Sequence, residues 1–146
     1  MRPALTSRKA KLIDYANLTK ANDKAEWFGE STEGIELRIR GDGNGPDPSS
    51  VELARTIAAT LGEVRRKAIE MAASFMKHDG DWHLTTIDIG EDAKRQECDS
   101  LIGLHFDPKD GSHDYGNTRF DIGFHLHAAE PATLQNRPRK LVITYW

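Results

Sequence analysis

The chain has one cysteine, no long hydrophobic run and none of the short motifs that mark common enzymes. Cys98 cannot form an internal disulfide, and in the charged connection "KRQECDS" it is expected to be an exposed thiol rather than a nucleophile. No apolar run approaches the roughly 20 residues that cross a bilayer, and the charged N-terminus does not resemble a secretory signal. G-x-S-x-G, H-E-x-x-H, P-loop and dinucleotide fingerprints are absent. A cytoplasmic protein is predicted, with no reaction specified.

What is present suffices for one folded domain. The 146 residues are 38% hydrophobic and 29% charged, which is typical of a globular chain. The formal net charge of −3 argues against a general binder of nucleic acid or membrane surfaces. Residues 1–24 are a polar basic segment with six Lys or Arg against two Asp, and either form a short helix or stay partly loose. Residues 25–146 are expected to form a single α+β domain.

Alternating apolar residues predict the strands. "EWFG" and "GIELRIRG" are interpreted as a hairpin, because Ile35, Leu37 and Ile39 alternate with charged residues. Segments 82–90, 100–106, 118–127 and 140–146 are rich in β-branched and aromatic residues. The connections between these four segments are too short for a crossover helix, so antiparallel pairing is expected.

One long helix is predicted between the hairpin and the later strands. Apolar residues recur at three- and four-residue spacing from Ser50 to about His78, and Ser49 with Glu52 has the spacing of a capping box. The expected order is β-β-α-β-β-β-β. We therefore predict an α+β two-layer sandwich, in which an antiparallel sheet of about five to six strands carries one long helix on one face.

The segment "RFDIGFHLHA" (Arg119 to Ala128) raises the question of a metal site. Its alternation turns Asp121, His125 and His127 away from the helix, and His105 of the preceding strand has the same orientation. Three imidazoles and a carboxylate on one face are ligands that zinc or iron accepts. If Phe106 lies near Thr118, however, six residues separate His105 from His125 along the pair, or roughly 20 Å. We therefore predict no metal and no cofactor. The alternative is a metal-dependent hydrolase that uses His105, Asp121, His125 and His127.

Residues 79–114 are strongly acidic. Ten Asp or Glu against three Lys or Arg give this segment a net charge of −7. Most of these acids lie in connections, so we expect their charge to gather at one rim of the sheet, where it would steer a basic partner. Solvated acids that protect sheet edges are an equally good explanation. The predicted partner-binding residues are Asp79, Asp81, Asp88, Glu91, Asp92, Asp107, Asp110, Asp114 and Tyr115.

The order of elements resembles a known group of proteins. Trp27, Gly29, Gly34 and the alternation over 35–39, followed by a turn-rich loop, an alanine-bearing helix and a strand meander, are similar to small bacterial α+β proteins of unknown biochemical activity. Several of those families accompany polymorphic or contact-delivered toxins as immunity proteins. The resemblance covers residues 25–146 and transfers no functional residue. It implies a stoichiometric binding protein without catalysis. The acidic rim would suit a toxin that acts on nucleic acid and presents a basic active site.

Three hypotheses remain open at this stage. The first is a cytoplasmic immunity protein without catalysis or cofactor, whose partner is a toxin or effector domain with a basic surface rather than a nucleic acid or a membrane. The second is the metal-dependent hydrolase. The third is a small adaptor that pairs with partners through a sheet edge.

Overall fold

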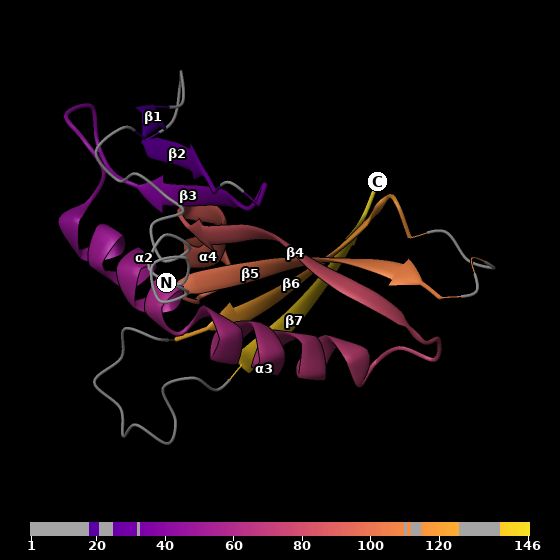
Figure 1. Cartoon of the computed structure of the whole chain (residues 1–146). Helices are drawn as coiled ribbons and strands as arrows, with labels where there is room; N and C mark the ends of the chain where they lie inside the picture. Colours follow the sequence, from indigo (N-terminus) through magenta and orange to yellow (C-terminus); the bar gives the residue numbers. More distant parts are fainter. Residues whose placement is uncertain (1–17, 21–24, 32, 110, 112–114, 126–137) are drawn as a thin grey trace, which may run out of the picture.

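The computed structural model is a twisted sheet with two helices along one side (Figure 1). It describes residues 18–20, 25–31, 33–109, 111, 115–125 and 138–146. Seven strands lie in chain order in the sheet: β1 (Thr19–Lys20), β2 (Glu26–Glu30), β3 (Glu36–Arg40), β4 (Gly80–Ile89), β5 (Ser100–Pro108), β6 (Thr118–Phe124) and β7 (Pro138–Tyr145). The helices are α2 (Pro48–Ala59), α3 (Leu61–Ala73) and α4 (Glu91–Arg95).

The α+β class and a mostly antiparallel sheet are confirmed, and two details differ from the prediction. The sheet has one strand more than expected, because the two residues of β1 pair with β2 at its edge. The pair β3–β4 is parallel, with Arg38 beside Asp88, whereas every other neighbouring pair is antiparallel. Parallel neighbours need a long crossover connection, and α2 with α3 supplies it. The N-terminal basic segment lies largely outside the described residues, and none of the described helices is long and apolar enough to cross a membrane.

The single long helix is a wrong prediction, because the helix breaks at Thr60. This residue leaves the helical region at φ −118° and ψ 26°, and its hydroxyl donates to the Thr56 carbonyl at 2.9 Å. Such a bond to the preceding turn bends helices, and Gly62 follows as a weak helix former. Ile57 and Val64 are both fully buried, so the apolar stripe continues across the break. Phe75, an apolar residue inside the predicted helix range, lies beyond α3 and is 64% exposed.

The start of α2 also differs from the predicted capping box. Asp47 is the N-cap: its side chain accepts from the Ser50 N–H and from the hydroxyls of Ser49 and Ser50, and Pro48 occupies the first helical turn. These bonds lower the pKa of the Asp47 carboxyl, led by those from the two hydroxyls. The helix therefore begins two residues earlier than expected, because a carboxylate satisfies its first free N–H groups better than Ser49 does.

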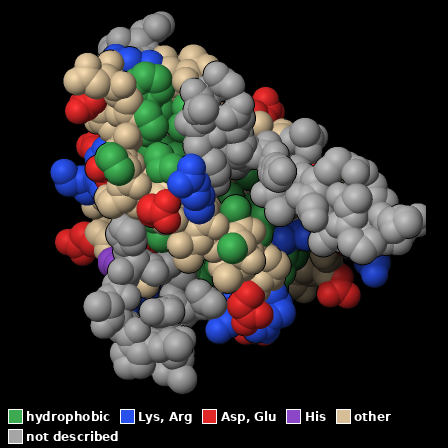
Figure 2. Space-filling model, turned by 60° about the vertical axis from the view of Figure 1, so that its left-hand side comes forward, with side chains coloured by type: hydrophobic (Ala, Val, Ile, Leu, Met, Phe, Trp, Pro, Cys, Tyr) green, Lys and Arg blue, Asp and Glu red, His purple; other side chains and the backbone are tan. Residues whose placement is uncertain are grey.

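The core lies between the helix pair and the side of the sheet that faces it. The strand alternation predicted this side correctly for β5 and β6, which bury every second residue against the helices. Figure 2 turns the side of β1–β3 and α2 forward and shows Lys and Arg side chains among Asp and Glu, with no large area of one sign. The largest fully buried side chains of β5 and β6 are Ile102, Leu104, Phe106, Phe120, Ile122 and Phe124.

Candidate functional site

The open face is the side of the sheet opposite α2 and α3. Strand pairing places its polar side chains in rows, since directly opposed residues of neighbouring strands lie side by side. Asp81 of β4 lies opposite Asp107 of β5, and His83 lies opposite His105. We name the region around these four residues, at the start of β4 and the end of β5, the distal end. The other end of β4 continues into α4 and is named the α4 end.

At the distal end, one carboxylate contacts two imidazoles. Asp107 Oδ2 lies 2.9 Å from His83 Nε2, and Asp107 Oδ1 lies 3.1 Å from His105 Nε2. The two rings stack with centroids 6.4 Å apart and an interplanar angle of 24°. All three side chains are partly open to solvent, with exposed fractions of 53% for His83, 34% for His105 and 57% for Asp107. Both imidazoles therefore aim the same ring nitrogen at a single acceptor.

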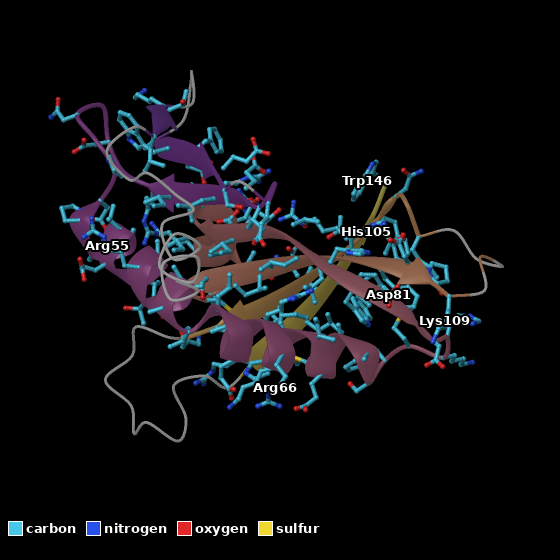
Figure 3. The ribbon with its side chains drawn as sticks, in the orientation of Figure 1. Arg55, Arg66, Asp81, His105, Lys109 and Trp146 are labelled. Carbon is cyan, nitrogen blue, oxygen red and sulfur yellow. The ribbon has the colours of Figure 1, made fainter. Side chains whose placement is uncertain are left out.

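Two large aromatic side chains lie at the same end of the sheet. β7 ends there, because Tyr145 pairs with Thr118 and the Trp146 N–H donates to the Asn117 carbonyl at 3.2 Å. Tyr145 is 74% exposed and Trp146 is 71% exposed. Figure 3 shows Trp146 on the same side of the molecule as His105 and Asp81, far from Arg55 on α2. The distal end thus combines exposed acids with exposed aromatic rings.

The α4 end has a different character, because its charges are paired. Arg38 lies beside Asp88 in the parallel pair and donates to Glu36 at 3.0 Å, while its other nitrogen lies 3.6 Å from Asp92 of α4 and 3.9 Å from Asp88. The guanidinium also lies over the Phe28 ring, 6.0 Å from its centroid. The surrounding carboxylates raise the pKa of Arg38, although burial acts against them as the largest single influence. One cation therefore holds three acids together.

Asp88 is the most buried of these acids, with 1% of its surface exposed. Its Oδ1 accepts from the Gly90 N–H at 2.7 Å, but its Oδ2 has no hydrogen-bond partner among the described residues. Burial raises the pKa of Asp88 to about 6, helped by the neighbouring charges of Asp92 and Glu26 and opposed by the Gly90 bond and Arg38. Glu26 is itself buried and accepts from the Glu91 N–H at 2.8 Å, where α4 begins.

Between the two ends the open face forms a shallow hollow of about 330 Å³. Arg119 and Asp121 line it, together with Asp92 of α4 and Trp146 of the distal end. The Arg119 Nε donates to both oxygens of Asp121, at 2.8 and 3.0 Å. Burial still raises the pKa of the Asp121 carboxyl, and Arg119 offsets this in part. Asp121 is therefore engaged in an internal ion pair and is not a free ligand.

The structure does not gather the predicted partner-binding acids at one rim. Asp79, Asp81 and Asp107 lie at the distal end, whereas Asp88, Glu91 and Asp92 lie at the opposite end of β4. Tyr115 packs edge-on against Phe106, with ring centroids 5.3 Å apart, and so belongs to the core. Asp110 and Asp114 lie outside the described residues. The predicted rim is thus two groups of acids, separated by the length of a ten-residue strand.

The alternative metal site of the hydrolase hypothesis is not assembled by the described residues. Leu104 pairs with Phe120 and Ser100 with Phe124, so His105 falls beside Arg119 and His125 falls beyond the other end of the pair. The expected separation of six residues, or about 20 Å, is confirmed. His127 lies outside the described residues. Within the described part of the chain, no group of three or more His, Cys, Asp or Glu side chains could hold a metal ion.

Cys98 is buried, contrary to the expectation of an exposed thiol. It is 8% exposed and packs against Gly123 of the open face, where a Cβ atom would collide with its sulfur. Its Sγ contacts the Gln96 carbonyl at 3.6 Å. Burial raises the pKa of the thiol, which leaves it protonated and unreactive at neutral pH. The sulfur fills the space between the α4 segment and the sheet.

Sequence reasoning missed two important residues, His83 and Arg38. His83 joins His105 because of an irregularity in β4: Leu84 pairs with Leu104, but Thr86 pairs with Gly103. Before this bulge the odd-numbered residues reach the open face, and after it the even-numbered ones do. The sequence holds the signal, because the apolar residues shift from even numbers (Trp82, Leu84) to odd numbers (Ile87, Ile89) across the two threonines of "WHLTTIDIG". Arg38 could be identified only once its parallel neighbour was known.

A comparison of the chain with known proteins finds no matching protein family, no similar curated protein and no similar solved structure. The candidate site is therefore argued from its geometry alone.

Proposed function

We propose that this chain is a non-catalytic binding protein that docks a basic protein partner on a distal acidic surface, formed by Asp79, Asp81 and Asp107 with Trp146. The observation that carries the proposal is the state of these acids. No Lys or Arg of the described residues forms an ion pair with any of the three. Because unneutralised carboxylates attract cationic surfaces over about 8–10 Å in physiological salt, they speed the encounter with a basic partner.

The acids on helices α2 and α3 differ from the distal acids, because they form ion pairs with basic residues of the same helix. Glu52 pairs with Arg55 at 3.0 Å, and Glu63 pairs with Arg66 at 2.8 Å, on the exposed sides of α2 and α3. These pairs neutralise their own surface, as is common for solvated helix faces. The distal acids are left unneutralised, and this difference supports a role in recognition for the distal acids rather than for the helix acids.

Trp146, which follows β7 at the same end of the sheet as the three acids, is the proposed anchor of this surface. Large aromatic residues carry much of the binding energy at protein interfaces, whereas charges at the rim mainly set orientation and encounter rate. An indole that is 71% exposed can bury most of its apolar area in a partner. Exposed acids and an exposed tryptophan at one end of the sheet favour a protein partner over a nucleic acid, whose phosphates the carboxylates would repel.

The partner class comes from the family resemblance stated above, in which immunity proteins neutralise toxins. A toxin that cleaves or modifies nucleic acid presents a basic active site, and an acidic surface would occlude it. The interaction is proposed to take place in the cytoplasm, where the single free thiol would stay reduced. We propose that the chain binds its partner in a fixed stoichiometric ratio and that the partner, not this chain, is the catalyst.

The test is co-expression with the product of the adjacent gene. We expect the two proteins to co-purify in equal amounts and the chain to restore growth to cells that express the adjacent product alone. The Asp79→Asn/Asp81→Asn double variant should slow association at low salt, and Trp146→Ala should speed dissociation. Glu63→Gln/Glu70→Gln on α3 is the matched control and should bind as the parent does. Failure both to co-purify and to rescue growth rejects the immunity function, and self-association without such a partner supports the adaptor.

A further inference from the structure

We propose that the outer edge of β7 pairs with the same edge of a second copy of this chain, which gives a two-fold symmetric dimer with one continuous sheet. β7, the yellow strand of Figure 1, is the last strand of the sheet, and no other strand of the described residues pairs with its outer edge. Antiparallel pairing of a strand with its own copy uses the same surface on both chains, so the assembly closes at two.

The two edges of the sheet differ in length and in charge. At the other edge, β1 has only two residues, Thr19 and Lys20. Short edge strands that carry a lysine are a common protection against the addition of a further strand. β7 has eight residues, and its last part with the residue that follows, "LVITYW" (141–146), contains no charged residue, proline or glycine. Such an exposed apolar edge is a template for another strand.

The backbone of β7 offers hydrogen-bonding groups along this edge. The Trp146 N–H donates to the Asn117 carbonyl, so the backbone groups of Trp146 are directed toward β6. Because these groups alternate in direction along a strand, those of Leu141, Ile143 and Tyr145 are directed outward. A two-fold axis through Ile143 would oppose these residues to those of the second copy and form about six backbone hydrogen bonds between the chains.

The side chains of β7 are self-complementary in this register. On the side of the sheet that faces the helices, Ile143 would contact Ile143 of the second copy, and Leu141 would contact Tyr145. Ile143 is 37% exposed and Tyr145 is 74% exposed, so pairing would bury apolar surface that now faces solvent. On the open face, Val142 would lie opposite Thr144. Aromatic and β-branched residues are favourable neighbours across paired strands.

The charges of β7 favour the antiparallel direction. Its two basic residues, Arg139 and Lys140, lie near its start. Parallel pairing would place them beside their own copies, whereas antiparallel pairing moves them to opposite ends of the ladder, with Lys140 opposite Trp146. The dimer leaves Asp81 and Asp107 uncovered, because β6 and β7 separate β4 and β5 from this edge. The inference therefore goes beyond the proposed function and does not compete with it.

The first experiment is sedimentation velocity of the full chain at concentrations from about 5 to 500 µM, since a single strand pair is a small interface with an expected Kd on the order of 10–100 µM. Ile143→Lys places two like charges directly opposite each other at the axis and should weaken the dimer at least about 10-fold. Phe75→Lys is the matched control: it adds the same charge at an apolar residue that is 64% exposed and lies outside β7, and it should dimerise as the parent does.

Disulfide cross-linking with oxidised glutathione tests the register. In Ile143→Cys the two Cα atoms would lie about 5.5 Å apart, a separation that a disulfide spans, and we expect a covalent dimer. In Tyr145→Cys the two thiols would lie about 13 Å apart along the ladder, and we expect little cross-linking. The native Cys98 is 8% exposed and should contribute little to either result.

Three outcomes would overturn the proposal. They are a chain that stays monomeric at every concentration, a dimer that folded Ile143→Lys leaves intact, and Tyr145→Cys that cross-links as well as Ile143→Cys. Thermal unfolding of each variant identifies any that fails to fold, and the mild change Ile143→Cys then still tests the edge. Ile143 is not part of the distal acidic surface, so dimerisation and binding to the proposed partner can fail separately.

Discussion

The two ends of the open face carry the same chemical groups in opposite states. At the α4 end, Asp88 is 1% exposed and shares the single cation Arg38 with two other acids. At the distal end, Asp81 and Asp107 are exposed, and no Lys or Arg ion pair reaches them among the described residues. The two ends share β4, which carries Asp81 near its start and Asp88 near its end. The composition of the sequence does not distinguish the acids of the two ends, whereas their burial in the structure does.

Under the proposed function, charge acts on folding stability at the α4 end and on partner recognition at the distal end. A carboxylate in a low-dielectric site alters the free energy of folding, because desolvation must be offset by partners. A solvated carboxylate changes stability little and remains available to an external cation. Substitutions at the two ends should therefore separate these effects.

The largest expected effect is that of Asp88→Asn. The pKa of Asp88 is raised from 3.8 to about 6 in the folded chain, so folding favours the protonated carboxyl. Stability is lost as the pH rises from about 4 through 6, because the folded chain must then release a proton that it holds more tightly than the unfolded chain does. A shift of about two pKa units corresponds to about 3 kcal/mol. The variant should be about 3 kcal/mol more stable than the parent at pH 7, with the advantage mostly gone at pH 4.

Urea unfolding at several pH values measures this difference. Asp81→Asn is the control from the distal end, where the gain should stay small at every pH. An advantage of Asp88→Asn that does not change with pH would contradict the buried, charged state of Asp88.

Arg38→Ala is expected to have the next largest effect on the free energy of unfolding, and it should destabilise the chain. It removes the cation that Glu36, Asp88 and Asp92 share, and leaves Asp88 buried without compensation. Because Arg38 is 26% exposed and Asp88 can take up a proton, we expect a loss of about 2 kcal/mol at pH 7, below the cost of a fully buried pair, and a smaller loss at pH 5. Arg95→Ala is the matched control: Arg95 pairs with the same Asp92 at 2.8 Å but is 70% exposed, so its loss should stay below about 0.5 kcal/mol.

A smaller gain is expected from Glu97→Gly at the end of α4. Glu97 has a left-handed backbone at φ 61°, and the Cys98 and Glu97 N–H groups donate to the Ala93 and Lys94 carbonyls at 3.0 and 2.9 Å. This is the bonding pattern of a helix end at which glycine is usual. Removing the Cβ atom from the left-handed region should stabilise the chain by about 1 kcal/mol in thermal or urea unfolding. A loss of stability would show that the Glu97 side chain contributes more than its backbone costs.

Much of the fold follows from local patterns, and the site does not. The strand alternation of β5 and β6 predicted Phe120, Ile122 and Phe124 in the core, because a period of two leaves one side for burial. The periodicity does not reveal the break at Thr60, because Ile57 and Val64 are seven residues apart, which is close to two helical turns with or without a kink.

The site depends on strand pairings and on a bulge, which the periodicity of the sequence does not reveal. The parallel pairing that brings Arg38 to Asp88 is a property of the crossover, and the row from His83 to His105 depends on a bulge between Leu84 and Thr86. Asp88 and His83 would lie on opposite sides of a regular strand, and the bulge places both on the open face. The acids of residues 79–114 form one charged segment in the sequence, but β4 separates them into two groups in space.

The double substitution Asp79→Asn/Asp81→Asn at the distal end is expected to have the smallest effect on stability. Both side chains are exposed, so the double variant should unfold within about 0.5 kcal/mol of the parent at any pH between about 4 and 8. Its effect should appear instead in association with the proposed basic partner, as a slower on-rate and a weaker dependence of that rate on salt. Asp88→Asn, which removes one charge from the α4 end, should leave the on-rate unchanged while it alters stability. A double variant that loses stability but binds as the parent does would reverse the assignment of the two ends.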